Sequence, residues 1–142
     1  MFGGRKGSSV RQVLKYLELK SGYSGNGPAW IARVGLSKSG RTVYFNGKAL
    51  KRGHDIAGNH LDLAAREEYW VSSVKKDGTD RHWAGSGRIS IEAGAVVEYL
   101  RIIGASELDT SKFDVIPDFE PTAVARLHTL ENMRSTDNKE SA

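Results

Sequence analysis

The sequence predicts a small, mostly β domain of the α+β class, an antiparallel meander or SH3-like barrel with one C-terminal packing helix. Three observations support this fold class. The chain has 142 residues, which is the size of one domain. Turn signals recur about every ten residues between short apolar segments. Few segments have the spacing of a long amphipathic helix, so the strands would curl into a small barrel or form a sheet covered by one helix.

The first strand is expected from Lys15, and two interpretations compete around it. Val10, Val13, Leu14 and Leu17 have the spacing of an amphipathic helix, whereas "KYLELKSG" alternates as a strand does. We favour the strand, with a short helical turn as an option before it. Three glycines and a proline in segment 21–28 then interrupt the chain.

A hairpin is expected where "AWIARVGL" and "RTVYFNG" flank the short turn "SKSG". Opposing Leu36 with Arg41 creates one apolar face. This face consists of Ala32, Val34, Val43 and Phe45. Arg33 would pair with Tyr44 on the other, solvent-exposed face.

The segment 46–59 is expected to be a basic loop. It would bring together Lys48, Lys51, Arg52 and His54. A second hairpin is expected around Asp77-Gly78, because a two-residue Asp-Gly turn is a strong hairpin signal. In this register Trp70 and Trp83 share one face with Arg81. The two tryptophans are then either buried core or a half-exposed platform.

The helix is expected over residues 92–103, with Gly104 as its C-terminal stop and Val96, Leu100 and Ile103 facing the sheet. "RISIE" precedes this helix as a strand, and "SKFDVI" is a candidate closing strand. We divide the chain into a flexible basic leader (1–14), a single β-rich domain (15–116) and a polar tail with room for a short helix (117–142).

Composition limits the classes of function. The absence of cysteine excludes disulfides, thiolate catalysis and zinc sites built on Cys. No apolar run is long enough for a signal peptide or a membrane span, so we expect a cytoplasmic protein without a membrane partner. The net charge is +4, and residues 1–116 carry the whole cationic excess. A basic body favours polyanionic partners, either nucleic acid or an acidic protein surface.

Motifs for metal, cofactor or nucleophilic chemistry are not found. The His and acidic residues from His54 to His82 match no metal-ligand spacing, and Ser86 lacks the strand-turn-helix context of a nucleophile elbow. We therefore expect neither a metal nor a cofactor, and more readily a binding protein than an enzyme. The alternative is a small hydrolase or nuclease-like enzyme. It would use His60, Asp62, Glu67 and His82.

Three runs of the sequence carry a resemblance to a family of short bacterial hypothetical proteins. They are "KYLELKSGYSGNGPAWIARVGLSKSGRTVYFNGKALKR", "EEYWVSSVKKDGTDRHWAGSGRI" and "EYLRIIG". The resemblance spans roughly residues 15–115 and implies a shared single-domain fold with no catalytic residues to carry over. Similar proteins sometimes bear the label 1-deoxy-D-xylulose-5-phosphate synthase. This chain lacks that enzyme's G-D-G and N-N diphosphate-binding pattern.

The function predicted from the sequence is a non-catalytic binding module for a polyanion, with nucleic acid as one specific candidate. The residues expected to bind it are Lys48, Lys51, Arg52, Trp70, Lys75, Lys76, Arg81, His82 and Trp83. A third option is an antitoxin-like protein-interaction component that dimerises through a sheet edge. The sequence leaves the oligomeric state open.

Overall fold

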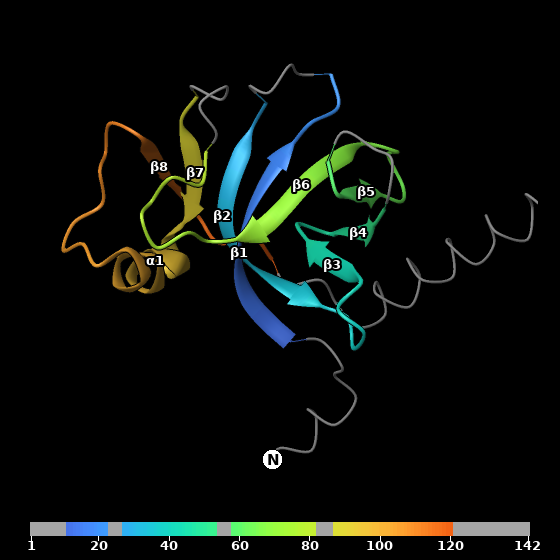
Figure 1. Ribbon diagram of the computed structural model, residues 1–142, viewed down its shortest axis with the longest axis horizontal. Coiled ribbons are helices and arrows are strands. Elements are labelled where there is room, and N and C mark those ends of the chain that lie inside the picture. Colours follow the sequence, from blue (N-terminus) through green and yellow to red (C-terminus); the bar gives the residue numbers. More distant parts are fainter. Residues whose placement is uncertain (1–10, 23–26, 54–57, 82–86, 121–142) are drawn as a thin grey trace, which may run out of the picture.

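A computed structural model describes residues 11–22, 27–53, 58–81 and 87–120 (Figure 1). Over these residues it confirms the predicted class, a mostly β fold with a small antiparallel barrel and one short α-helix. The strands are β1 (Arg11–Leu19), β2 (Ala29–Leu36), β3 (Thr42–Phe45), β4 (Lys48–Arg52), β5 (His60–Asp62), β6 (Glu68–Ser73), β7 (Ile89–Glu92) and β8 (Phe113–Ile116). A 3₁₀ turn, η2 (Ala93–Ala95), leads into α1 (Val96–Ile103).

The barrel is an up-and-down meander formed by β1 to β6. Each strand pairs antiparallel with the next one in the chain, and β6 returns to pair with β1, for example Val71 with Leu17. Closure leaves no free edge among these six strands. In the described part of the chain, neither helix has the length and apolarity that crossing a bilayer requires.

Alternating residues of the barrel strands fill its lumen. The buried lumen residues are Leu17, Ala32, Val34, Val43, Phe45, Leu50, Tyr69 and Val71. Leu17 and Leu50 are completely buried. Each such side chain contributes about 1.5–3 kcal/mol by leaving water, so this cluster holds the barrel together. We call it the barrel core.

The opposite faces of β1 and β2 carry a second cluster. Its buried members are Leu14, Tyr16, Ala29, Ile31, Ile89, Ile91, Ala95, Tyr99 and Phe113. The three residues predicted to face the sheet from α1 pack here, which confirms that expectation. Tyr99, 1 % exposed, is the most buried residue of the helix. Gly104 ends α1 with a φ of 72°, as predicted. We call this cluster the second core.

One edge of β2 is shared between two different strands. Its first half pairs in parallel with β7 through Trp30 and Ile31, and its end pairs with β3 from Gly35. Between them, the Glu92 carboxylate accepts the Arg33 N–H at 2.7 Å. Its other oxygen accepts the N–H of Phe119, also at 2.7 Å. This buried carboxylate therefore satisfies the backbone where β2 passes from one neighbour to the other.

The predicted meander is wrong for β7 and β8. β7 joins β2 in parallel and β8 joins β7 in parallel, with α1 crossing between the two strands (Figure 1). A parallel connection needs such a crossover, and the helix that the sequence indicated supplies it.

The start of the chain settles the competition between helix and strand. β1 is a strand throughout and begins at Arg11, so residues 11–14 of the predicted leader belong to it. In the first hairpin the observed pairs are Gly35 with Tyr44 and Leu36 with Val43. The register differs by two residues from the predicted one, so the same side chains share the apolar face. Arg33 instead forms an ion pair with Glu98.

The basic loop predicted for 46–59 is wrong at its start. Asn46 and Gly47 have φ values of 50° and 74°, which suit a two-residue hairpin turn, and Lys48–Arg52 is strand β4. The hairpin predicted at Asp77-Gly78 is wrong over residues 79–81. The chain does turn there, but both edges of β6 are already paired with β1 and β5. No edge remains for a returning strand.

Candidate functional site

Polar side chains gather at the barrel end where β1 begins and β4 and β6 end. On β1 and β4 a cation occupies the lumen-facing position two residues from a leucine of the barrel core: Lys15 next to Leu17, and Arg52 next to Leu50. The same step leads from Val43 to Arg41 and from Val71 to Ser73. With His60 of β5, which pairs with Arg52, these residues form what we call the cationic mouth: Lys15, Arg41, Arg52, His60 and Ser73.

Contacts tie the residues of the cationic mouth together. The Lys15 ammonium donates to the Ser73 hydroxyl at 3.2 Å. The backbone N–H of Arg52 donates to the backbone carbonyl of Arg41 at 2.9 Å, which places the two residues side by side at the start of the β3–β4 hairpin. Within the described residues Lys15, Arg41 and Arg52 form no ion pair with a carboxylate. Their positive charges therefore add at one end of the barrel.

The charges of the cationic mouth affect the pKa of His60. Its side chain is buried, with the residue 4 % exposed. Burial, followed by the charges of Arg52 and Lys15, lowers the pKa of His60 to about 4. The imidazole is consequently neutral at pH 7, and the two cations that act on it are those of the mouth.

The other predicted cations of β4 do not join Arg52. Lys48 lies at the opposite end of the strand, and its ammonium is 4.0 Å from the Asp62 carboxylate. Lys51 alternates with Arg52 and so lies on the outer side of the barrel wall. Strand geometry therefore separates residues that a loop would have brought together.

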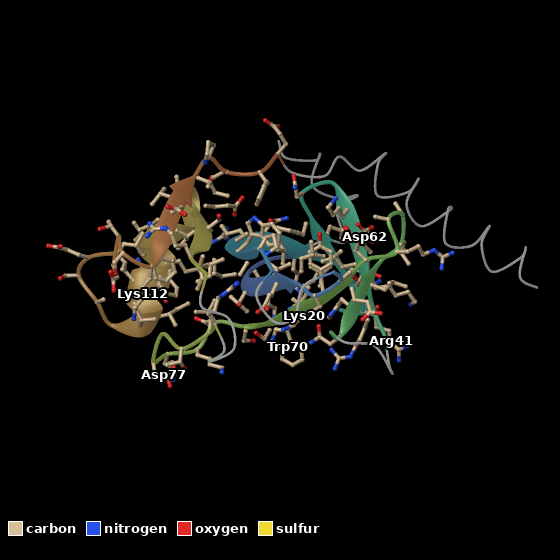
Figure 2. All side chains as sticks on the ribbon, turned by 90° about the horizontal axis from the view of Figure 1, so that it is seen from above. Lys20, Arg41, Asp62, Trp70, Asp77 and Lys112 are labelled. Atoms are coloured by element: carbon tan, nitrogen blue, oxygen red, sulfur yellow. The ribbon has the colours of Figure 1, made fainter. Side chains whose placement is uncertain are left out.

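The predicted aromatic and hairpin residues lie elsewhere. Trp70 is 37 % exposed on the outer face of β6, where it pairs with Glu18, so it is not part of either core. Figure 2 shows Trp70 beside Lys20 on this face. Lys75 and Lys76 are exposed in the turn that follows β6. His82 and Trp83 lie outside the described residues.

A buried charged cluster lies on the same outer face and includes Arg81. The Tyr16 hydroxyl donates to Glu18 at 2.7 Å, and Lys20 donates to the other Glu18 oxygen at 3.1 Å. Arg81 donates to the Gly27 carbonyl at 2.7 Å. Burial and the Glu18 carboxylate raise the pKa of Tyr16 well above its usual value. The Arg81 contact joins Gly27 to Arg81 beside the barrel wall.

Asp62 and Glu67, two residues of the enzymatic alternative, form hydrogen bonds that stabilise the turn after β5. The Asp62 carboxylate accepts the Ala64 N–H at 3.0 Å and caps the turn after β5. Glu67 meets Asp62 through its backbone carbonyl, which accepts the Asp62 N–H at 2.7 Å. Among the described residues no three His or acidic side chains are close enough to hold a metal ion.

Sequence reasoning identified Arg52 but missed Lys15 and Arg41 as members of the site. Arg41 reaches Arg52 through the β3–β4 hairpin, whereas Lys15 is far away in the sequence and reaches this end through the closing β1–β6 pairing. A local signal did exist, because Asn46-Gly47 predicts the β3–β4 hairpin and with it the lumen-facing parity of Arg52. Comparisons with protein-family models, curated proteins and solved structures gave no match for this chain.

Proposed function

We propose that this protein is a non-catalytic binding module whose cationic mouth binds polyanions, with nucleic acid as the ligand. The observation that supports the proposal is the set of three cations, Lys15, Arg41 and Arg52, that gather at one barrel end without a described carboxylate partner. Such a cluster of cations attracts phosphate groups and releases their counterions on binding.

The surroundings of the mouth offer further contacts for a chain of phosphates. Lys75 and Lys76 follow Ser73, a mouth residue, by two and three positions and are exposed. The half-exposed ring of Trp70 lies three residues before Ser73 on the same strand, about 10 Å away along it. A nucleic acid that leaves the mouth along β6 would meet both the cations and an aromatic ring suited to base stacking. We keep the cytoplasmic location as part of this proposal.

The test is a titration of fluorescently labelled single-stranded and duplex oligonucleotides, followed by anisotropy at several salt concentrations. Arg41→Gln and Arg52→Gln remove exposed mouth cations, whereas Lys112→Gln is the matched control. Figure 2 shows Lys112 and Arg41 on opposite sides of the molecule. We expect each mouth variant to weaken binding and to flatten the log–log salt slope by about 1, with the control unchanged.

Two outcomes would contradict the proposal. Binding that ignores salt, or that weakens equally in the control, would remove the mouth from the interaction. No binding to any oligonucleotide, combined with salt-sensitive binding to a polyglutamate peptide, would favour an acidic protein partner instead.

A further inference from the structure

The chemistry of the cationic mouth is more specific than a positive charge alone. The lumen of the barrel is filled by side chains, and the charges of Lys15 and Arg52 both act on one ring at its end, that of His60. Such an arrangement suits one compact anionic group. A run of phosphates along a strand would instead need a line of cations.

His60 adds a hydrogen-bond acceptor to this group of donors. Asn59 is fixed by Val71, whose N–H donates to Asn59 Oδ1 and whose carbonyl accepts from Asn59 Nδ2, both at 2.8 Å. The atom 2.9 Å from His60 Nδ1 is therefore the acceptor Oδ1, so His60 Nδ1 carries the proton. In the neutral ring this leaves a lone pair on Nε2, and the described residues form no hydrogen bond to it.

An acceptor among cations distinguishes between the two kinds of phosphate in a nucleic acid. An internal phosphodiester carries one negative charge and no proton. A terminal phosphomonoester has a second ionisation near pH 6, so it either donates its remaining proton or carries a second charge. Only the phosphomonoester can use the His60 lone pair directly, or supply enough negative charge to protonate the ring.

We infer that the cationic mouth selects the terminal phosphomonoester of a nucleic-acid strand over internal phosphodiesters, with Lys15 and Arg52 as donors and His60 as the proton-exchanging partner. This inference rests on the proposed function and names the group that the site recognises. A bound dianion offsets the charges of Lys15 and Arg52, so His60 gains affinity for a proton.

The charges that act on His60 come from β4, which pairs with β5, and from β1, which is separated from β5 by β6. Arg52 on β4 and Lys15 on β1 are the charges that act on its titration. Asp62, on the same strand as His60, accepts the Ala64 N–H and pairs with the Lys48 ammonium. Phosphate binding is therefore expected to take up a proton on His60 and to tighten as the pH falls from 8 toward 6.

The experiment compares one oligonucleotide in three forms, with a 5′-phosphate, a 3′-phosphate or hydroxyl groups at both ends, by calorimetry in two buffers of different ionisation enthalpy. We expect a phosphorylated form to bind about tenfold more tightly than the hydroxyl form, the effect of one charge-assisted hydrogen bond, with net proton uptake. Arg52→Gln, at an exposed position, should reduce this preference toward unity, and Lys112→Gln should keep it.

The possible results separate the inference from the proposed function. Equal affinity for all three forms would overturn the selectivity and leave the polyanion-binding proposal standing. A preference without proton uptake, or one that survives in Arg52→Gln, would remove His60 and the mouth from the recognition. The absence of binding by every form would overturn both.

Discussion

The barrel core and the second core lie on opposite faces of the same two strands, β1 and β2, yet they are built differently. The barrel core is enclosed by six antiparallel strands that follow one another in the chain. In the second core, residues of α1 pack against side chains on the outer faces of β1, β2 and β7. Figure 1 shows α1 beside β7 and β8. One core is thus closed by local pairings, and the other depends on residues that come much later in the sequence.

This difference explains why the sequence of β1 was ambiguous. In a strand with one solvent-exposed face, apolar and polar residues alternate clearly. β1 instead buries both faces, with Leu17 in the barrel core and Leu14 and Tyr16 in the second core. Apolar residues on both faces produce an i, i+3, i+4 spacing by coincidence, and this spacing resembles a helix. A helical spacing that also fits a strand can therefore indicate a strand shared by two cores.

The largest expected effect is the loss of unfolding free energy when a leucine of β1 is replaced by alanine, and it should differ between the two cores. Leu17→Ala empties part of the barrel core and should cost about 3–5 kcal/mol, because the side chain is fully buried. Leu14→Ala acts on the second core, where the residue is 9 % exposed, and should cost about 2–3 kcal/mol. Both are measured by urea unfolding followed by circular dichroism.

The shape of the unfolding curves sharpens this comparison. Since β1 and β2 belong to both cores, we expect one transition with an unchanged denaturant slope in each variant. Two separate transitions in Leu14→Ala would mean that the second core unfolds by itself.

A smaller effect is expected at the junction between the cores. Glu92→Gln replaces a carboxylate that accepts two backbone N–H groups by an amide with one acceptor, and should cost about 1–3 kcal/mol. Glu98→Gln is the matched control, since Glu98 pairs with Arg33 in solvent and should change stability by about 0–1 kcal/mol. Equal losses in the two variants would show that Glu92 has no special role at the junction.

The smallest expected effect concerns two aspartates in the turn that follows β6. Asp80 is 4 % exposed, and one of its oxygens accepts the Lys75 N–H at 2.7 Å while the other has no partner in the described structure. Burial raises the pKa of Asp80 above its ordinary value of 3.8, so its ionisation weakens the folded state as the pH rises through this raised pKa. Asp80→Asn should therefore be more stable than the wild type at pH 7 and lose that advantage near pH 3.

Asp77, in the same turn, has a pKa that is shifted in the opposite direction. Its carboxylate accepts the Thr79 hydroxyl at 2.6 Å and the Thr79 N–H at 3.0 Å, and these bonds lower the pKa of Asp77. Its contribution is present above pH 4 and disappears as the pH falls, so Asp77→Asn should be slightly less stable than the wild type at pH 7. Thermal melts of both variants between pH 3 and 7 measure these slopes. Parallel behaviour of the two variants would contradict the assignment.

The fold class, the helix with its Gly104 stop and the apolar face of the first hairpin could be predicted because local patterns determine them. The two Xaa-Gly turns show that a local sequence pattern does not by itself determine whether a hairpin forms. Asn46-Gly47 joins two paired strands, whereas Asp77-Gly78 turns the chain without a hairpin, because β6 already has β1 and β5 as neighbours. Strand pairing is a competition over the whole sheet, and the dipeptide alone does not decide it.

The candidate site was only partly predictable for a related reason. Arg52 stands out in a basic segment, but the cationic mouth also needs Lys15 of β1 and Arg41, which directly precedes β3. Lys15 joins them only when the β1–β6 pairing closes the barrel, and Arg41 joins Arg52 through the β3–β4 hairpin. Lys48 shows the converse, since it is close to Arg52 in sequence and at the other end of the strand in space.

The shared edge of β2 also sets an order of events during synthesis. Residues 11–73 contain the whole barrel, and most of their strand pairs form between neighbours in the chain, so the barrel can assemble as soon as β6 has left the ribosome. The hydrogen bond from the Arg33 N–H to Glu92, however, cannot form until Glu92, 59 residues later in the chain, has been synthesised. We expect the nascent protein to pass through a state with a finished barrel and an exposed apolar flank on β1 and β2, and this flank is where a chaperone would bind.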